Sequence, residues 1–245
     1  MWENISSEKS ESFIERHFGA NDKDTSETST KPAITISRAE GAGGLTVASN
    51  LADYLQTHTS SREVWTVFSQ HLVAKVLEEH NHHKSIGDFM KEGHKSSLAD
   101  AIEELLGLHP STWTLVEQTN ATILSLAQMG NVILVGRGAN IVTRELENAF
   151  HVYLVGSLEK RVERAQSTFN LDQKSAINYI KKKDGARRRY LKDNFDKDID
   201  DPLLYHIVIN TDLVRYEEAA RLIGDEVIDR FKLKSPRKLR EIRAV

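Results

Sequence analysis

The sequence predicts a three-layer α/β fold that is built on a mainly parallel β-sheet. Short apolar runs of strand length alternate with longer segments whose apolar residues have helical spacing, which is typical of strands joined by crossover helices. The run Val132–Val135 is apolar at every position, as expected for a strand that is buried on both faces of a parallel sheet. A glycine-rich turn, Gly41–Gly44, joins the first apolar run to the first helical segment, and such turns often present backbone N–H groups to a ligand.

The N-terminal half is predicted to begin with a flexible segment. Residues 1–31 are rich in Ser, Thr, Glu and Asp, a composition that is typical of disordered chain. A strand is predicted over 33–37 and a helix over 44–57, on either side of the glycine-rich turn. A second, short strand is predicted over 64–68. Three further helices are predicted over 70–79, 98–106 and about 110–129.

The C-terminal half supplies three more predicted strands, over 132–135, 151–155 and 205–209. A basic helix that contains Arg161 and Arg164 is predicted after the second of these strands, and a long basic helical stretch runs over 172–192. A final helix is predicted over 214–231. Residues 232–245 form a basic tail, which we expect to be either a solvated chain end or a contact for an anionic partner.

The composition excludes several classes of function. The net charge is −3, so no basic field favours nucleic acid as a partner. The chain has no cysteine, which excludes disulfides, thiolate metal sites and cysteine catalysis. No apolar run approaches the ~20 residues of a membrane span, and the N-terminus lacks the basic and apolar regions of a signal peptide. We therefore expect a cytoplasmic protein without a membrane partner, and a homodimer is kept as a hypothesis.

The glycine-rich turn is a candidate phosphate-binding loop. Its backbone N–H groups lie where a helix N-terminus attracts anions, and the Thr46 hydroxyl is a candidate ligand for Mg²⁺. Gly44 stands where a regular P-loop has its lysine, and Arg38 is the nearest replacement cation in the sequence. The alternative interpretation is a tight strand-to-helix turn with a purely structural role. The candidate binding residues are Gly41, Ala42, Gly43, Gly44, Leu45 and Thr46.

A second candidate site is Arg137, which lies between Gly136 and Gly138 just after a predicted buried strand. Ligands of parallel α/β sheets bind beyond the carboxyl ends of the strands, and the planar guanidinium matches phosphate oxygens two at a time. An ion pair at the edge of the sheet is the alternative interpretation.

A third candidate is the dense run of cations from Lys181 to Arg189, interrupted by Asp184. A cationic segment that closes over a polyphosphate would explain this density, whereas a solvated helix face or an RNA-binding stripe are alternatives. Arg161 and Arg164 are three residues apart and therefore share a helix face, where they line an anion site or are solvated.

Four histidines form a separate cluster in a polar region of the chain. A zinc site is one interpretation, but the region lacks the HExxH pattern, and surface histidines are the alternative. The residues are His80, His82, His83 and His94.

In four collinear pieces, the chain resembles the cytidylate kinase-like family of P-loop nucleoside monophosphate kinases. The pieces are Ile34–Arg38 with Gly41–Gly44, then Gly130–Asn140, Asp184–Tyr190 and Asp201–Asp212. The resemblance runs from about Ile34 to Phe231 and implies a P-loop kinase domain over 32–231. That domain would have a five-stranded sheet flanked by helices, a helical acceptor-binding insert, and a lid over about 172–200.

The resemblance also implies a function, namely transfer of the ATP γ-phosphoryl group, with Mg²⁺, to a nucleoside monophosphate such as CMP or dCMP or to a related small acceptor. By this analogy residues 41–46 hold the donor phosphates and Arg137 holds the acceptor phosphate. The lid arginines Arg187 and Arg188 stabilise charge on the transferring group, with Arg38 as the replacement cation. Further predicted substrate-binding residues are Asp184, Arg161 and Arg164.

Two departures from the family pattern motivate a second hypothesis. True cytidylate kinases have lysine where this chain has Gly44. They also have the tripeptide Gly-Arg-Asp where this chain has Gly136-Arg137-Gly138. The alternative to a kinase is therefore a nucleotide-binding sensor or pseudokinase that acts through a protein partner without transferring phosphate.

Overall fold

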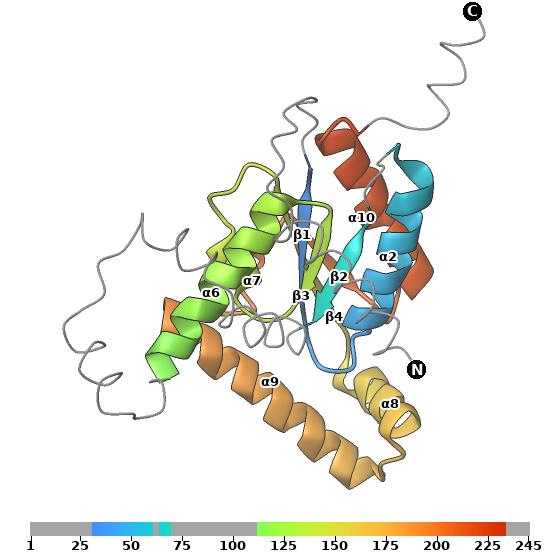
Figure 1. Ribbon diagram of the computed structural model, residues 1–245. Helices are drawn as coiled ribbons and strands as arrows, with labels where there is room; N and C mark the ends of the chain where they lie inside the picture. The colour runs from blue at the N-terminus through green and yellow to red at the C-terminus, as the bar shows by residue number, and fades with distance from the viewer. Residues whose placement is uncertain (1–30, 61–63, 70–111, 234–245) are drawn as a thin grey trace, which may run out of the picture.

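The computed structural model describes residues 31–60, 64–69 and 112–233 of the 245-residue chain (Figure 1). The strands are β1 (Ala33–Arg38), β2 (Thr66–Ser69), β3 (Val132–Val135), β4 (Ala149–Val155) and β5 (Ile207–Asn210). The helices are α2 (Gly44–His58), α6 (Thr112–Met129), α7 (Ala139–Val142), α8 (Leu158–Phe169), α9 (Gln173–Phe195), the 3₁₀ turn η1 (Pro202–Leu204) and α10 (Tyr216–Arg230).

The five strands form one sheet in the order β2-β3-β1-β4-β5, and every neighbouring pair is parallel. Parallel neighbours require crossover connections, which the intervening helices provide. The predicted three-layer α/β fold and its five-stranded parallel sheet are therefore confirmed. The central strand is β1, so the glycine-rich turn that follows it lies in the middle of the carboxyl edge of the sheet.

The alternating sequence of β1 explains how it is buried on both faces. Ile34 and Ile36 pack into the larger core cluster together with α2 and α10. The intervening Thr35 and Ser37 are buried on the opposite face, where their hydroxyl groups pair with His151 and Asn140. Buried hydroxyls are tolerated because these hydrogen bonds offset the loss of water.

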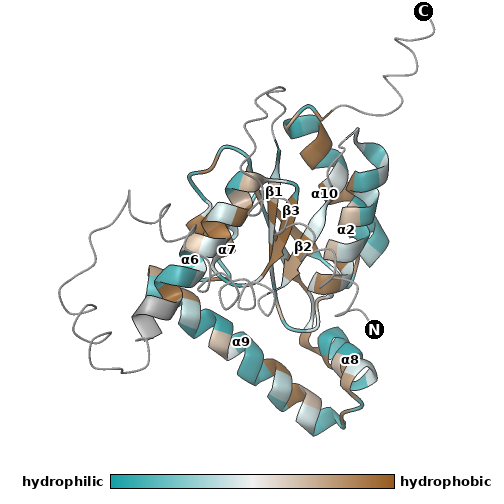
Figure 2. Ribbon diagram, in the orientation of Figure 1, coloured by the Kyte–Doolittle hydropathy of each residue, from teal (hydrophilic) through white to brown (hydrophobic). Residues whose placement is uncertain are grey.

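The two faces of the sheet are covered by different helices. Helices α2 and α10 cover one face, where Leu51, Leu55 and Ile223 are fully buried. Helices α6 and α7 cover the other face around Leu126 and Leu134. Figure 2 shows that apolar residues concentrate in the strands and on the inner sides of these helices, which is the expected arrangement when burial of apolar surface stabilises the fold.

Helices α8 and α9 form a hairpin that lies across the carboxyl ends of the strands (Figure 1). Their N-termini are fixed by Ser157 and Asp172, whose side chains accept hydrogen bonds from backbone N–H groups of the first turns. The two helices pack together through a small apolar cluster of Val162, Ala165, Ala176 and Ile180. Most of the remaining hairpin surface is hydrophilic (Figure 2), but the end of α9 also packs on the sheet through Leu191, which shares an apolar cluster with Tyr153 and Ile199.

Several predicted boundaries differ from the structure. The strand predicted over 205–209 begins at Ile207 because η1 and Tyr205 occupy the preceding positions, and the strand predicted over 151–155 begins earlier, at Ala149. The strand predicted over 64–68 is shifted to Thr66–Ser69. The helices predicted over 70–79 and 98–106, the four clustered histidines, and most of both terminal segments lie outside the described residues.

Candidate functional site

The glycine-rich turn between β1 and α2 contains two positions that suit glycine and no larger residue. Gly41 and Gly43 have positive φ values of 81° and 80°. A Cβ atom on Gly43 would lie 2.3 Å from the ring of Tyr216, and one on Gly41 would lie 2.8 Å from the carbonyl oxygen of Arg161. The turn is therefore held in one conformation by the residues packed against it.

The turn leaves a series of backbone N–H groups unpaired. Helix α2 begins without a side-chain cap, whereas α8 and α9 each have one. Within the described parts of the chain, no hydrogen-bond acceptor is found for the N–H groups of Gly41, Gly43, Gly44, Leu45 and Thr46. Unpaired donors at the N-terminus of a 15-residue helix form a favourable environment for an anion.

The side chain of Arg38 lies directly over Gly44. A Cβ atom on Gly44 would lie 3.0 Å from Arg38 Cγ and 3.2 Å from Arg38 Cδ, so the missing side chain makes room for the arginine. Among the residues that the structure describes, the Arg38 guanidinium has neither a hydrogen bond nor an ion pair. Burial, reinforced by the positive charges of Arg187 and Arg137, lowers its pKa to about 10. The nearby carboxylates of Glu40 and Asp184 partly oppose this lowering of the pKa, and the group is still cationic at neutral pH.

Arg137 extends from the turn that follows β3. Its guanidinium stacks on the ring of Tyr190 in α9, with 4.4 Å between Cζ and the ring centroid, and no ion pair of Arg137 occurs within the described ranges. Burial lowers the pKa of Arg137, and the charge on Arg187 lowers it further. The charge of Arg187 thus acts on both Arg38 and Arg137, and an anion near these three arginines would relieve the repulsion among them.

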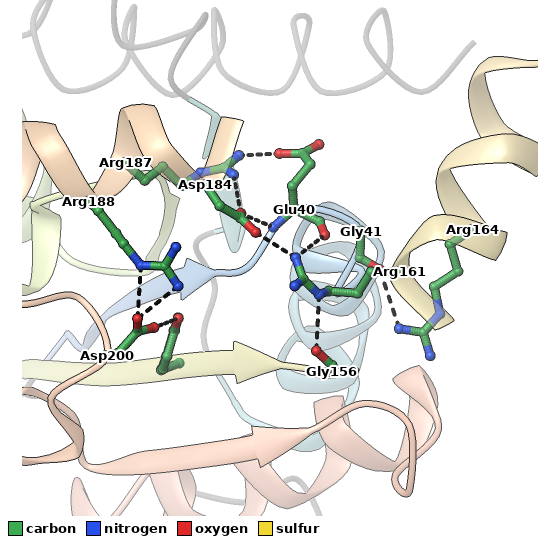
Figure 3. A network of polar contacts seen from close by, with 10 residues as sticks. Glu40, Gly41, Gly156, Arg161, Arg164, Asp184, Arg187, Arg188 and Asp200 are labelled. Atoms are coloured by element: carbon green, nitrogen blue, oxygen red, sulfur yellow. Dashed lines mark hydrogen bonds and ion pairs between the residues drawn. The ribbon is translucent and has the colours of Figure 1, made fainter. Parts of the chain in front are cut away.

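A polar network connects the turn to the α8–α9 hairpin (Figure 3). Asp184 of α9 accepts hydrogen bonds from the Glu40 backbone N–H at 2.8 Å and from Arg161 of α8 at 2.6 Å. Arg187 forms an ion pair with the Glu40 carboxylate and lies 3.4 Å from Asp184 Oδ1. Arg161 also donates to the carbonyl oxygens of Glu40 and Gly156. The four charged side chains are 10–17% exposed, so water screens their interactions poorly.

Arg164 fastens the other side of the turn to the segment after β5. It donates to the Gly41 carbonyl at 3.3 Å and to the Thr211 carbonyl and hydroxyl at 2.7 and 3.1 Å. Its guanidinium also lies over the Tyr216 ring, 5.3 Å from the centroid. Arg161 and Arg164 thus both bind carbonyl groups of the turn, which fixes the turn from the α8 side.

Arg188 is not brought to the turn. It pairs instead with Asp200, whose second oxygen accepts a hydrogen bond from Tyr153, and the Arg188 side chain is 58% exposed. Figure 3 shows this pair separate from the group around Glu40. The two neighbouring arginines of α9 therefore have different surroundings.

The remaining predicted residues of the turn differ in exposure. Ala42 is buried, whereas Leu45 and Thr46 are exposed on the first turn of α2, so the Thr46 hydroxyl is accessible. No group of three or more His, Asp, Glu or Cys side chains suited to a metal ion is found among the described residues. Thr46 would have to bind a cation together with a ligand, which is usual for Mg²⁺ in phosphate sites.

Sequence reasoning missed three residues of this region. Glu40 is one of them. A carboxylate directly before a phosphate-binding loop indicates that a cation must lie nearby, and this signal could have identified it. Tyr190, which supports Arg137, depends on the rotation of α9 and carried no sequence pattern. Asn140 is fully buried, and its Nδ2 lacks a partner among the described residues while its Oδ1 accepts from Ser37.

A comparison with protein families shows which family has this sequence pattern. The model of the cytidylate kinase-like family matches residues 33–213. The chain belongs to the cytidylate kinase-like family. The match includes the turn after β1, Arg137 and the α8–α9 hairpin, which are the parts that meet at the carboxyl edge of the sheet. Membership supports a nucleotide or small-molecule kinase.

Individual relatives agree with this family. A cytidylate kinase of Thermoplasma acidophilum is 26% identical over 135 residues, which cover 54% of this chain and 71% of that protein. A cytidylate kinase of Methanocaldococcus jannaschii is 25% identical and covers 47% of this chain and 66% of that protein. An uncharacterized protein from Eubacterium ventriosum has a similar fold, with a TM-score of 0.58 and 18% identity over 80% of this chain and 98% of that one.

None of the helices within residues 31–60, 64–69 and 112–233 has both the length and the apolar character that a membrane-spanning helix needs.

Proposed function

We propose that this member of the cytidylate kinase-like family transfers the γ-phosphoryl group of ATP to a nucleoside monophosphate, of the CMP or dCMP type, or to a related small acceptor. The observation that carries the proposal is the Arg38 guanidinium across Gly44, which has no hydrogen-bond or ion-pair partner among the described residues, beside N–H groups of α2 that likewise find no acceptor there. An unpaired, partly buried cation is costly unless an anion compensates it. Arg38 would thus replace the lysine that this turn lacks.

The residues present fit the phosphates of ATP. The N–H groups of residues 41–46 would hold donor phosphate oxygens, and the Thr46 hydroxyl would take part in holding Mg²⁺. When bound, Mg²⁺ neutralises charge on the phosphates and orients them. Arg38 would add a fixed positive charge beside the same phosphates.

Arg137 and Arg187 complete the proposed roles. Arg137, held by Tyr190, would bind the acceptor phosphate, and Arg187 would stabilise charge on the transferring group. Phosphoryl transfer requires mainly positioning and charge stabilisation. The absence of a general base among the proposed residues is therefore compatible with catalysis. Arg161 and Arg164 would support the turn, and the prediction of a catalytic Arg188 has the weakest support because Asp200 binds it.

The proposal is tested by measuring ADP release from Mg-ATP with CMP, dCMP, UMP, AMP and GMP as acceptors. Arg137→Ala should raise the KM for the preferred acceptor about tenfold or more, because a charge-assisted bond to phosphate is lost. Its Kd for ATP, measured by calorimetry, should change less than about twofold. Arg144→Ala is the matched control, because Arg144 is exposed and its one ion pair within the described ranges is with its neighbour Glu145.

Two outcomes would contradict the proposal. Equal losses of ATP and acceptor binding in Arg137→Ala would refute the division of roles. ATP binding with no acceptor-dependent ADP release would favour the second hypothesis, a nucleotide sensor that binds without transfer.

A further inference from the structure

We infer that Asp184 is an internal competitor beside the phosphate-binding turn, an anion of the lid that holds donors which a phosphate group on the turn would otherwise recruit. This inference rests on the proposed function, because it presumes that the turn binds phosphate. It adds a property that membership of the family does not supply, namely that the N–H of Glu40, next to the turn, and the side chains of Arg161 and Arg187 already contact a carboxylate of α9.

The contacts of Asp184 are those expected of a phosphoryl group. Its carboxylate accepts from the backbone N–H of Glu40 at 2.8 Å, which is the one N–H between Arg38 and α2 that pairs with α9. It also accepts from Arg161 at 2.6 Å and lies 3.4 Å from Arg187. Oδ1 of this carboxylate accepts from the Glu40 N–H and faces Arg187, and Oδ2 accepts from Arg161, a set of donors that resembles those with which proteins bind phosphate.

The low exposure of Asp184 and Arg161 indicates that a phosphate group would compete with Asp184 instead of binding beside it. Asp184 and Arg161 are 13% and 12% exposed, so a second anion at the same donors would meet the carboxylate charge with little screening. The donors that Asp184 uses are also limited to the Glu40 N–H and the two arginines. A phosphate that takes any of them must either displace Asp184 or be repelled by it.

The network is built so that Asp184 can leave without stranding its partners. Arg161 would keep the carbonyl oxygens of Glu40 and Gly156, and Arg187 would keep the Glu40 carboxylate. Displacement would therefore release two cations that still have acceptors and can turn toward the ligand. Because Asp184 lies in the middle of the 23-residue helix α9, its release would remove one of the contacts that join the lid to the turn, whereas the contacts of Arg161 and Arg187 with Glu40 would remain.

The test compares anion binding by Asp184→Asn with binding by the unmodified chain. Inorganic pyrophosphate is the probe, because it lacks base and ribose and reports the phosphate site alone. The amide keeps the size of the carboxylate and removes its charge, so we expect the Kd for pyrophosphate to fall at least about tenfold. Asp184→Glu, which keeps the charge, should not tighten binding by more than about twofold.

Asp200→Asn is the matched control. It removes a carboxylate that pairs with an arginine of the same helix but lies away from the turn, so its Kd should equal that of the unmodified chain. Thermal unfolding of every variant verifies that each is folded at the temperature of the titration. The same titrations with ATP show whether the effect extends to the nucleotide.

The outcomes separate this inference from the proposed function. Tighter binding of pyrophosphate by Asp184→Asn, and by no other variant, supports the role of Asp184 as a competitor. This holds even if binding by the unmodified chain is too weak to measure. Binding by the unmodified chain with equal or weaker binding by Asp184→Asn overturns the competitor and leaves the proposed function in place. A chain that binds neither pyrophosphate nor ATP, with or without Asp184, overturns both.

Discussion

The pair Arg38 and Gly44 shows how a cation from one position in the sequence can take the place of a side chain at another position. The methylene groups of Arg38 occupy the space that a side chain at position 44 would need, with contacts of 3.0 and 3.2 Å to an added Cβ atom. The cation is supplied by the end of β1 instead of the start of α2. Because β1 is paired on both sides, the base of this side chain is fixed by the sheet.

At this scale the first prediction concerns Arg38→Ala. The substitution should reduce kcat for ADP release about 10²-fold or more and weaken ATP binding, because a positive charge beside the phosphates is lost. The measurement is steady-state kinetics together with calorimetric ATP titration. Arg144→Ala serves as the control for removing an arginine elsewhere. Unchanged kinetics in Arg38→Ala would mean that the turn functions through its N–H groups alone.

At the scale of elements, the docking of α9 depends on a glycine of the turn after β3. Gly138 has a φ of 79°, and an added Cβ atom would lie 2.9 Å from the Phe195 ring and 3.2 Å from the Tyr190 ring. The two rings lie edge to face, and Tyr190 also supports Arg137. This packing explains why position 138 suits glycine. The end of α9 occupies the space that a side chain there would need.

The second prediction compares two glycines of the same turn. Gly138→Ala should lower the free energy of unfolding by about 2–4 kcal/mol, from the positive φ and the displaced rings together. Gly136→Ala should change it by less than about 0.5 kcal/mol, because nothing lies within 4 Å of an added Cβ atom. Urea denaturation measures both. Equal effects of the two substitutions would contradict the proposed packing of α9.

At the scale of the whole molecule, a buried histidine links the central strands. His151 of β4 is 6% exposed, its Nδ1 lies 2.9 Å from the Thr35 hydroxyl of β1, and its backbone N–H donates to His206 next to β5. Burial, with the nearby charges of His206 and Arg230, lowers the pKa of His151 from 6.5 to about 4. The neutral ring therefore belongs to the folded state.

The third prediction is a loss of stability in mild acid. Between pH 6.5 and about 4 the unfolded chain binds a proton at His151 that the folded chain does not, so the free energy of unfolding falls as the pH falls. The full contribution of this residue is up to about 3 kcal/mol, present above pH 6.5 and lost near pH 4. Urea denaturation at several pH values should show a shallower dependence in His151→Gln. Parallel curves for both chains would refute the role of this histidine.

Much of this architecture could be predicted from local patterns. The uninterrupted run Val132–Val135 predicted a buried parallel strand, and the short apolar run over 33–37 predicted the first strand; both predictions were confirmed. Glycine at positions 41 and 43 predicted the turn, because its φ values suit no other residue well. The sequence also indicated Arg38 as the nearest cation, and the structure places its side chain over Gly44.

The contacts of the lid could not be predicted in the same way. Glu40 and Asp184 are 144 positions apart, and their pairing depends on how the α8–α9 hairpin packs across the sheet edge. Arg187 and Arg188 are adjacent in sequence and equally basic, yet helical rotation directs one to Glu40 and the other to Asp200. Such differences depend on tertiary packing, which the periodicity of one helix does not contain.

The overlap of Arg38 with position 44 also constrains how this turn can change during evolution. A lysine introduced at position 44 would crowd the arginine already present, because its Cβ atom would lie 3.0 Å from Arg38 Cγ, and loss of Arg38 first would remove the cation that lies over position 44. Each single step is therefore expected to be worse than either end state, which is a case of reciprocal epistasis. Lineages with a cation from the strand and lineages with a cation from the helix should remain separate, each with its own pair of residues inherited together.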